Sequence, residues 1–180
     1  MRKLLNEELD RLSIESFKSS KKIPVVVILD NVRSMNNIGS VFRTSDAFRI
    51  EYIALCGITA TPPNKEIHKT ALGATESVAW KYYAATSDAV EEFKGKGYTI
   101  CAIEQAEGSK QLQEFAIKSD GKYALIFGHE IKGVEQEIVD MSECCIEIPQ
   151  YGTKHSLNIS VSAGIVLWEF YRSFHALLAE

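Results

Sequence analysis

The sequence predicts an α/β protein with a mostly parallel sheet flanked by helices. Short apolar runs rich in Val, Ile and aromatic residues alternate along the chain with segments of helical spacing. Hydrophobic residues make up 46% of the 180 residues, which is ordinary for a globular protein. No run is long enough to span a membrane, and the charged N-terminus has no apolar signal core. We therefore expect a cytoplasmic protein without a membrane partner.

The N-terminal segment stands apart from this alternation. Apolar positions between Leu5 and Phe17 have the spacing of an amphipathic helix over residues 1–19, and the polar stretch SSKKIP then links it to the rest. We divide the chain into a helical N-terminal extension, residues 1–22, and one domain, residues 23–180.

Six strands and six helices are expected within the domain. The strands are Val25–Leu29 (VVVIL), Tyr52–Cys56 (YIALC), Ser77–Tyr82 (SVAWKY), Thr99–Ile103 (TICAI), Tyr123–Phe127 (YALIF) and Cys145–Ile148 (CIEI). The helices, with apolar residues three or four apart, are Ile38–Phe48, Lys65–Leu72, Ser87–Lys96, a turn around Leu112–Phe115, Glu135–Met141 and Ile159–Leu178. Because helices separate most of the strands, crossover connections should make the sheet largely parallel.

The last of these helices is apolar on nearly all sides. Val161, Ile165 and Trp168 line one face, while Val166 and Phe170 lie on another. A helix with this pattern must be buried on nearly all sides. A C-terminal helix of a 180-residue monomer rarely achieves such burial, so we expect a homodimer formed through this helix.

The charge of the chain disfavours a generally basic nucleic-acid-binding surface. Twenty Lys and Arg residues stand against 24 Asp and Glu, giving a net charge of −4. Residues 1–24 differ, with an excess of basic side chains. An RNA partner would therefore be held by local patches. Two interpretations of the N-terminal segment stay open, a short helix that binds RNA and a helix that packs on the body.

The cysteines do not form a metal set. None of the four is spaced as C-x-x-C, and no histidine cluster completes a zinc site. Three lie in apolar, strand-like surroundings, which is typical of small buried side chains. We expect no metal.

The first of three unusual loops, NNIGSVFRTSDAF at residues 36–48, follows the first strand. Ligands of open α/β sheets bind beyond the carboxyl ends of strands, where this loop lies. Asn37 stands near a helix start, where Asn commonly caps, and Gly39 leaves room for another backbone. Arg43 falls about 140° around the helix from the apolar stripe, so it is not expected to pack in the core. A capped helix with a solvated arginine explains the same spacing. The missing G-x-G-x-x-G disfavours a dinucleotide site.

The second and third loops also follow strands. In IFGHEIKGV, Glu130 lies between Gly128 and Gly133, either at a pocket mouth or as a carboxylate near the next helix N-terminus. In IPQYGTKHSLNISVSAG, an extended SLN would direct Ser156 and Asn158 to one side and Leu157 to the other. Asn158 taken alone is better explained as a helix cap.

Taken together, the three loops resemble the three motifs of the SpoU/TrmH class of SPOUT RNA methyltransferases. They occur in the family's order and spacing across residues 24–171. The resemblance implies methyl transfer from S-adenosylmethionine to a ribose 2′-hydroxyl of RNA by a homodimer. It also implies a C-terminal deep trefoil knot, an exception to the rule that chains do not thread loops.

The resemblance carries over to particular residues. Those that match the family's active-site positions are Asn37, Arg43, Glu130, Ser156 and Asn158. Cofactor contacts are implied for Ile103, Glu104, Gly128, Ile148 and the backbone of Ser156 and Leu157. His129 and His155 flank these sites, but the family pattern requires neither, and we assign neither a catalytic role.

The expected substrate is tRNA rather than rRNA, because the chain has the size of the minimal members of the class. The alternative from a different class of function is a catalytically idle knotted factor that binds RNA or assists ribosome assembly. It would not need Arg43, Glu130 and Asn158 together, and all three are present. A third interpretation, an α/β enzyme acting on another nucleotide, is disfavoured by the missing glycine-rich loop.

Overall fold

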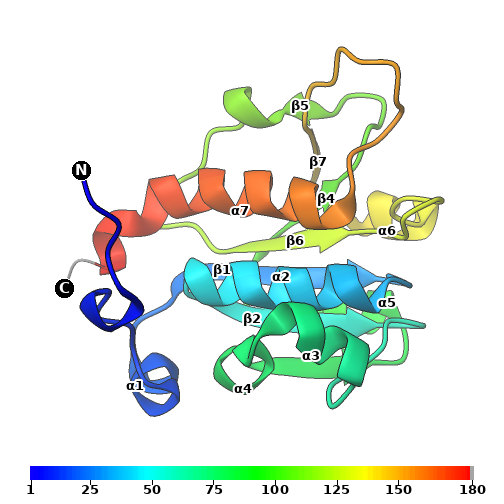
Figure 1. The fold of residues 1–180 in the computed structure, drawn as a ribbon. Coiled ribbons are helices and arrows are strands. Elements are labelled where there is room, and N and C mark those ends of the chain that lie inside the picture. Colours follow the sequence, from blue (N-terminus) through cyan, green and yellow to red (C-terminus); the bar gives the residue numbers. More distant parts are fainter. Residues whose placement is uncertain (179–180) are drawn as a thin grey trace.

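The computed structural model describes residues 1–178 and contains one seven-stranded sheet between helices (Figure 1). The strand order is β3-β2-β1-β6-β4-β7-β5, and neighbouring strands pair in parallel. The strands are β1 (Ile23–Asp30), β2 (Ile50–Cys56), β3 (Trp80–Tyr83), β4 (Thr99–Ile103), β5 (Lys110–Gln111), β6 (Tyr123–Phe127) and β7 (Cys144–Glu147). The predicted α/β class with a parallel sheet is confirmed.

Helices cover both faces of the sheet. They are α1 (Ile14–Ser19), α2 (Met35–Ala47), α3 (Lys65–Ala71), α4 (Ala74–Ser77), α5 (Thr86–Gly95), α6 (Gln136–Met141) and α7 (Ile159–Phe174), with short 3-10 helices η1 (Asn6–Glu8), η2 (Leu112–Glu114) and η3 (His175–Leu178). The two cores divide the central strand β1 between them. Val25, Val27 and Leu29 pack in the core that contains α2 and α7, while Val26 and Ile28 pack towards α5 and α6. Burial on both faces explains why this strand is a continuous apolar run.

Some elements differ from those expected. The N-terminal helix is confined to α1, since residues 1–13 hold only the short η1. The strand expected from Ser77 begins at Trp80 because α4 precedes it, and the Ser77 hydroxyl bonds to the Ala74 carbonyl and the Asp46 carboxylate. The two-residue β5 gives no periodic signal. The expected helix at the C-terminus is α7 followed by η3, and the last two residues of the predicted domain lie outside the described ones.

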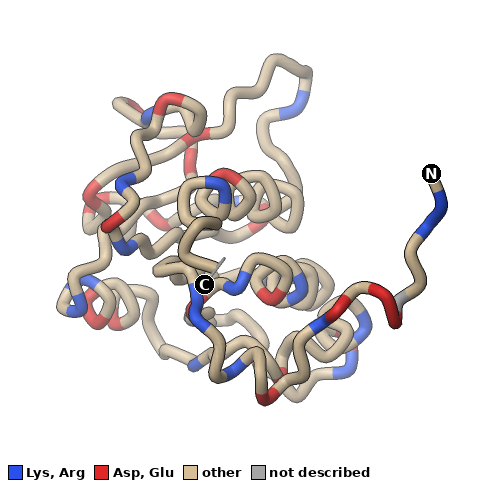
Figure 2. The backbone as a smooth tube through the Cα atoms, turned by 90° about the vertical axis from the view of Figure 1, so that its left-hand side faces the viewer, with Lys and Arg blue, Asp and Glu red and all other residues tan. Residues whose placement is uncertain are grey.

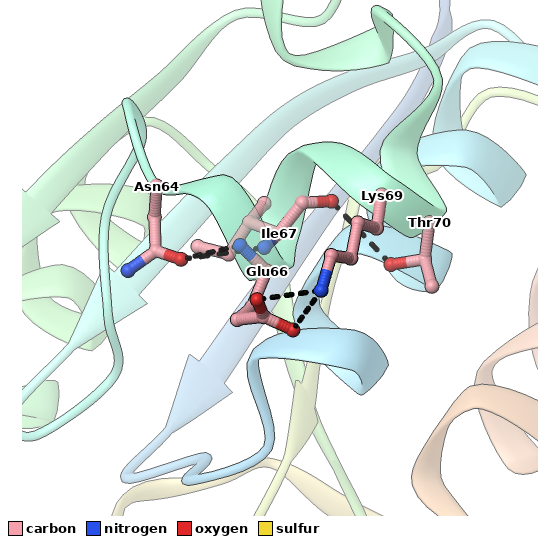
Figure 3. Close-up of polar contacts among 5 residues, drawn as sticks. All are labelled: Asn64, Glu66, Ile67, Lys69 and Thr70. Carbon is pink, nitrogen blue, oxygen red and sulfur yellow. Dashed lines mark hydrogen bonds and ion pairs between the residues drawn. The ribbon is translucent and has the colours of Figure 1, made fainter.

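Local polar contacts shape helix α3, which lies beside α2 (Figure 3). The Asn64 side-chain oxygen accepts hydrogen bonds from the backbone N–H groups of Glu66 and Ile67, at 2.9 and 3.4 Å, and so caps the helix. Lys69 pairs with Glu66 at 2.7 Å, and the Thr70 hydroxyl also lies near the Ile67 carbonyl. The sequence of α3 therefore specifies its own start and one exposed ion pair.

Close contact between α2 and α3 depends on Gly39. A Cβ at this position would lie 2.1 Å from the Thr70 Oγ1 and 2.3 Å from the Ile67 carbonyl oxygen. The Thr70 hydroxyl also donates to the Asn36 carbonyl at 2.9 Å, which joins the two helices. The prediction that Gly39 allows close approach of another backbone is confirmed.

Helix α7 is buried on one side. Phe170 and Val166 are fully buried, whereas Val161, Ile165 and Trp168 are 49%, 40% and 49% exposed. The second apolar face predicted from the sequence is therefore uncovered within a single chain. None of the helices in residues 1–178 has the length and apolar character needed to cross a membrane.

Candidate active site

A cavity of about 470 Å³ lies beyond the carboxyl ends of β4, β6 and β7. This volume is within the usual range of small-molecule sites. Eight of the ten residues that the sequence predicted for the site line it: Ile103, Glu104, Gly128, Glu130, Ile148, Ser156, Leu157 and Asn158. Segments far apart in the chain are thus brought to one place, at the edge of the sheet where open α/β proteins bind ligands.

The lining of this cavity combines apolar walls with an excess of acidic groups. The apolar part includes Ile103, Ile146 and Phe127. Three carboxylates contribute to the lining, those of Glu104, Glu130 and Glu147, against the single Lys132. This composition favours a ligand with an apolar body and positive charge.

Glu130 fastens the second loop to the start of helix α2. Its carboxylate accepts hydrogen bonds from the backbone N–H of Arg33 at 3.1 Å and of Ser34 at 2.9 Å. It also accepts one from the Asn37 side-chain amide at 3.1 Å. The carboxylate therefore lies at the helix N-terminus of α2, whose partial positive charge favours an anion. Of the two interpretations that the sequence left open, Glu130 lies at the mouth of the cavity, and the helix N-terminus that it meets is that of α2 rather than of the helix that follows it.

Two opposing influences act on the pKa of Glu130. Burial raises the pKa, but the N–H groups of Ser34 and Arg33 and the Asn37 amide stabilise the charged form and hold it below its usual value. The carboxylate is thus ionised at neutral pH and acts as an acceptor at the rim of the cavity.

Asn37 reaches the site through Glu130 and does not cap α2. Ser34 is the N-cap, because its hydroxyl accepts a hydrogen bond from the Asn37 backbone N–H at 3.3 Å. The helix begins three residues earlier than the spacing suggested, and this places the largely buried Asn37 side chain within the first turn. The sequence contained this signal as Ser34, a favoured N-cap residue.

Within the second loop, Gly128 packs closely against the backbone of Gly133 and Val134. A Cβ on Gly128 would lie 2.1 Å from the Gly133 carbonyl carbon and 2.2 Å from the Val134 nitrogen, so only glycine fits. The Glu104 carboxylate accepts hydrogen bonds from the backbone N–H of Val134 at 3.0 Å and of Gln105 at 2.9 Å. Glu104 therefore holds the loop after β6 to the end of β4 as well as lining the cavity.

The third loop closes the cavity on the side of α7. Asn158 is the N-cap of α7, and its side-chain oxygen accepts hydrogen bonds from the Ser160 N–H at 2.8 Å and the Ser160 hydroxyl at 2.6 Å. The interpretation of Asn158 as a cap is confirmed, and the residue lines the cavity as well. Leu157 also lines it, beside Ser156.

Arg43 is the predicted residue that lies elsewhere. It is exposed on α2 and lines a second cavity of about 600 Å³, formed with the N-terminal segment and the end of α7. Asn37 lies six residues earlier on the same helix, or about 9 Å along the helix axis. Within one chain, Arg43 and the cavity that contains Gly128 are therefore separate.

Several polar residues around the site were not predicted. The Gln105 side chain donates to the His155 carbonyl at 2.8 Å and so joins the segment after β4 to the third loop. Asp30, fully buried at the end of β1, accepts hydrogen bonds from the Thr86 hydroxyl at 2.6 Å and the Glu135 N–H at 3.1 Å. A charged residue directly after the run VVVIL was the available signal for Asp30. Gln105 gave none.

His129 has a structural role in the second loop. Its Nδ1 accepts hydrogen bonds from the backbone N–H of Ile131 at 3.0 Å and of Lys132 at 3.4 Å. Its backbone also exchanges two hydrogen bonds with Gly133. An accepting Nδ1 places the proton on Nε2, a tautomer assigned from these partners. Among residues 1–178, no group of three or more His, Cys, Asp or Glu side chains could hold a metal ion.

Comparison with known proteins gives consistent matches. The model of the SpoU rRNA Methylase family matches residues 24–168. A tRNA (guanosine(18)-2′-O)-methyltransferase of Aquifex aeolicus is 31% identical over 173 residues, covering 94% of this chain and 78% of the relative. A Staphylococcus haemolyticus protein assigned to the TrmH family of tRNA/rRNA methyltransferases is 28% identical over 162 residues, or 90% of this chain. The chain spans only 64% of that relative's length.

Solved structures share the fold. An AdoMet-bound rRNA methyltransferase from Sinorhizobium meliloti superposes with a TM-score of 0.77 at 29% identity, covering 90% of this chain and 61% of that one. A TrmH/SpoU tRNA modifying enzyme from A. aeolicus has the same TM-score and identity, covering 89% and 79%.

Proposed function

Because the chain belongs to the SpoU rRNA Methylase family, we propose that it methylates a ribose 2′-hydroxyl of RNA with S-adenosylmethionine as the methyl donor. The observation that carries this proposal is the cavity beyond β4, β6 and β7, lined by residues of the second and third loops, with the first loop joined to its rim by the hydrogen bond from Asn37 to Glu130. An AdoMet-bound relative with the same fold supports the choice of cofactor.

The lining of the cavity suits this cofactor. S-adenosylmethionine has an apolar adenine, a cationic sulfonium and an ammonium group, and the cavity offers apolar walls with more carboxylates than lysines. The residues proposed to hold it are Ile103, Glu104, Gly128, Ile148 and the backbone of Ser156 and Leu157. When bound, it supplies an electrophilic methyl group on sulfur.

The residues of the chain would then position the ribose and its proton. A 2′-hydroxyl is a poor nucleophile until its proton is removed or polarised, and alignment of the reacting atoms contributes much of the rate. We propose that Arg43 holds the phosphate beside the target ribose through two parallel hydrogen bonds. A guanidinium stays protonated in proteins, which makes Arg43 a costly general base. Asn37 and Glu130 would fix the loop, and Ser156 and Asn158 would shape the junction of cofactor and ribose.

We propose a homodimer through α7, in which Arg43 of one subunit acts at the cofactor cavity of the other. Val161, Ile165 and Trp168 form one exposed apolar stripe at helical spacing, which a second copy would cover. Arg43 is exposed on α2, which packs beside α7. The trefoil knot belongs to the same proposal, since the relatives that share this fold are SpoU-family methyltransferases.

The proposed substrate is tRNA rather than rRNA. The A. aeolicus relative, of which the matched region covers 78%, is named a tRNA 2′-O-methyltransferase. The name of the S. haemolyticus relative includes both tRNA and rRNA, so the experiment must offer both.

The test is transfer of label from methyl-labelled S-adenosylmethionine to separate pools of unmodified tRNA and rRNA. Digestion and mass spectrometry then identify the product. A 2′-O-methyl nucleoside in tRNA is the expected result. Methylation on a base, or binding of cofactor and RNA without transfer, would contradict the proposal, and the second outcome would favour the idle RNA-binding factor.

A further inference from the structure

The second cavity is lined by arginines whose side chains form no hydrogen bonds or ion pairs among the described residues. Arg11, Arg43 and Arg49 all line it, from the N-terminal segment, the middle of α2 and the second residue beyond α2. Within residues 1–178, none of these three side chains has a hydrogen-bond or ion-pair partner. Three guanidinium groups without partners around one hollow are suited to a ligand with several negative charges.

The acidic groups of the cavity compensate only part of this charge. Asp10 and Asp46 also line it, which leaves a local excess of positive charge in a chain whose net charge is −4. Asp46 is engaged by the Ser77 hydroxyl rather than by an arginine. Lys22 lies close enough to Arg49 and Asp46 for their charges to act on its pKa. Figure 2 shows that basic and acidic residues are otherwise interspersed along the chain.

The backbone of Arg49 is a second, independent observation. Its φ is +50°, in the left-handed region that costs most side chains about 1 kcal/mol or more and that glycine adopts freely. Its backbone N–H donates to the Asp46 carbonyl at 3.1 Å, and its own carbonyl accepts from the Ile23 N–H at 3.0 Å, so the conformation is fixed by the turn. The turn therefore holds Arg49 in a conformation that glycine would adopt without strain, with the arginine at the wall of the cavity.

The N-terminal segment builds the opposite wall of this cavity. Phe17 of α1 is buried, which anchors the segment to the body, and Leu12 and Arg11 extend from it along the cavity. The two interpretations of this segment left open by the sequence are therefore compatible: it packs on the body, and in doing so it brings Arg11 beside Arg43.

We infer that this second cavity binds backbone phosphates of the RNA substrate, with Arg11 and Arg49 as phosphate-contacting residues beside Arg43. The inference rests on the proposed function, because it takes RNA as the ligand. Phosphates on either side of the target ribose carry one negative charge each, and the three guanidinium groups would hold a short run of them. The site positions the strand and carries no base specificity.

The experiment measures binding of the full-length protein to fluorescently labelled unmodified tRNA at several salt concentrations. Arg49→Gly removes the cation and relieves the left-handed strain, and Arg11→Gln replaces an exposed side chain, so both variants should fold. Lys96→Gln, just beyond the end of α5 across the sheet, is the control for loss of one charge. Each arginine variant should bind several-fold more weakly, and the slope of log affinity against log salt should fall by about 0.7–0.9. The control should match the wild type.

Equal slopes for the arginine variants, the control and the wild type would overturn the inference, and so would a wild type that does not bind the labelled tRNA. Affinity for S-adenosylmethionine should be unchanged in both arginine variants, which excludes general misfolding. Binding does not require methyl transfer. A protein that binds through these arginines but methylates no RNA would refute the proposed function alone, and an active protein with unchanged slopes would refute this inference alone.

Discussion

Glu130 shows how one carboxylate can serve two loops. Its three donors lie on the segment between β1 and the first turn of α2, while Glu130 itself belongs to the loop after β6. Hydrogen bonds to a charged group contribute more than those between neutral groups. The ionised carboxylate therefore connects the two loops and fixes one rim of the cavity.

Replacement of this carboxylate should alter the acid stability of the protein. The folded-state pKa of Glu130 is lowered, so its contribution is fully present above the unfolded value of about 4.3 and is lost as pH falls through the folded value. Glu130→Gln should lower the free energy of unfolding at pH 7 by about 1 kcal/mol. Urea unfolding at pH 7 and pH 3 should show that the gap between variant and wild type narrows in acid. A gap that is constant with pH would contradict this role for the charge.

Substitution of Arg43 by lysine distinguishes the effect of its positive charge from the effect of its bidentate geometry. Lysine keeps the positive charge but offers no planar pair of donors. If Arg43 aligns the ribose by a bidentate phosphate contact, Arg43→Lys should lower kcat by about 10²-fold, the effect of a small misalignment. Affinity for S-adenosylmethionine should not change, because Arg43 does not line the cofactor cavity. Near-normal turnover of the lysine variant would show that bidentate geometry is not needed.

Among the structural elements, the loop after β6 depends most on a single glycine. A Cβ at Gly128 would meet backbone atoms of Gly133 and Val134, which cannot swing aside as a side chain would. Gly128→Ala should therefore displace the loop at a cost of about 1–3 kcal/mol, and S-adenosylmethionine should bind roughly tenfold or more weakly. Isothermal titration calorimetry measures the affinity for S-adenosylmethionine. Gly95→Ala, where an added Cβ meets nothing within 4 Å, is the control. Unchanged affinity in Gly128→Ala would show that the loop tolerates displacement.

Elements with strong periodicity were predictable from the sequence, and short ones were not. Strands β1 and β6, buried on both faces, stand out as VVVIL and YALIF. β5 has two residues and α4 has four, too few to establish a period. The start of α2 was missed because Ser34, rather than Asn37, satisfies the first turn. The α2 stripe begins at Ile38, so periodicity could not reveal the preceding turn.

The site was predictable as a set of residues but not as a set of contacts. Loops after parallel strands are expected to meet at one edge of the sheet, and eight of the predicted residues do line one cavity there, although the first loop reaches it only through the Asn37–Glu130 hydrogen bond. Which backbone groups Glu130 accepts from depends on loop conformation, which local spacing does not determine. The separation of Arg43 from the cavity follows from the direction of α2, which runs away from that edge after its first turn.

For the whole molecule, the exposed apolar face of α7 predicts that the protein has the mass of a dimer in solution. A chain of 20.1 kDa that pairs through Val161, Ile165 and Trp168 should sediment at twice that mass. Ile165→Asp would place a charge in the apolar contact and should give the monomer mass. Ile58→Asp changes an apolar side chain that is 63% exposed and should remain a dimer. A wild-type monomer at micromolar concentration, or a dimeric Ile165→Asp, would place the interface elsewhere.

The proposed dimer also predicts where Arg43 acts. Arg43→Lys impairs the arginine and leaves the cofactor cavity intact, whereas Gly128→Ala damages the cavity and leaves the arginine. If Arg43 acts on the partner's cavity, a mixed dimer of the two variants contains one complete site. Random exchange of equal amounts should then restore about a quarter of the wild-type activity, because half the dimers are mixed and each has one of two sites. If Arg43 acts within its own chain, mixed dimers contain no complete site and mixing restores nothing. Activity before and after subunit exchange therefore distinguishes the two arrangements.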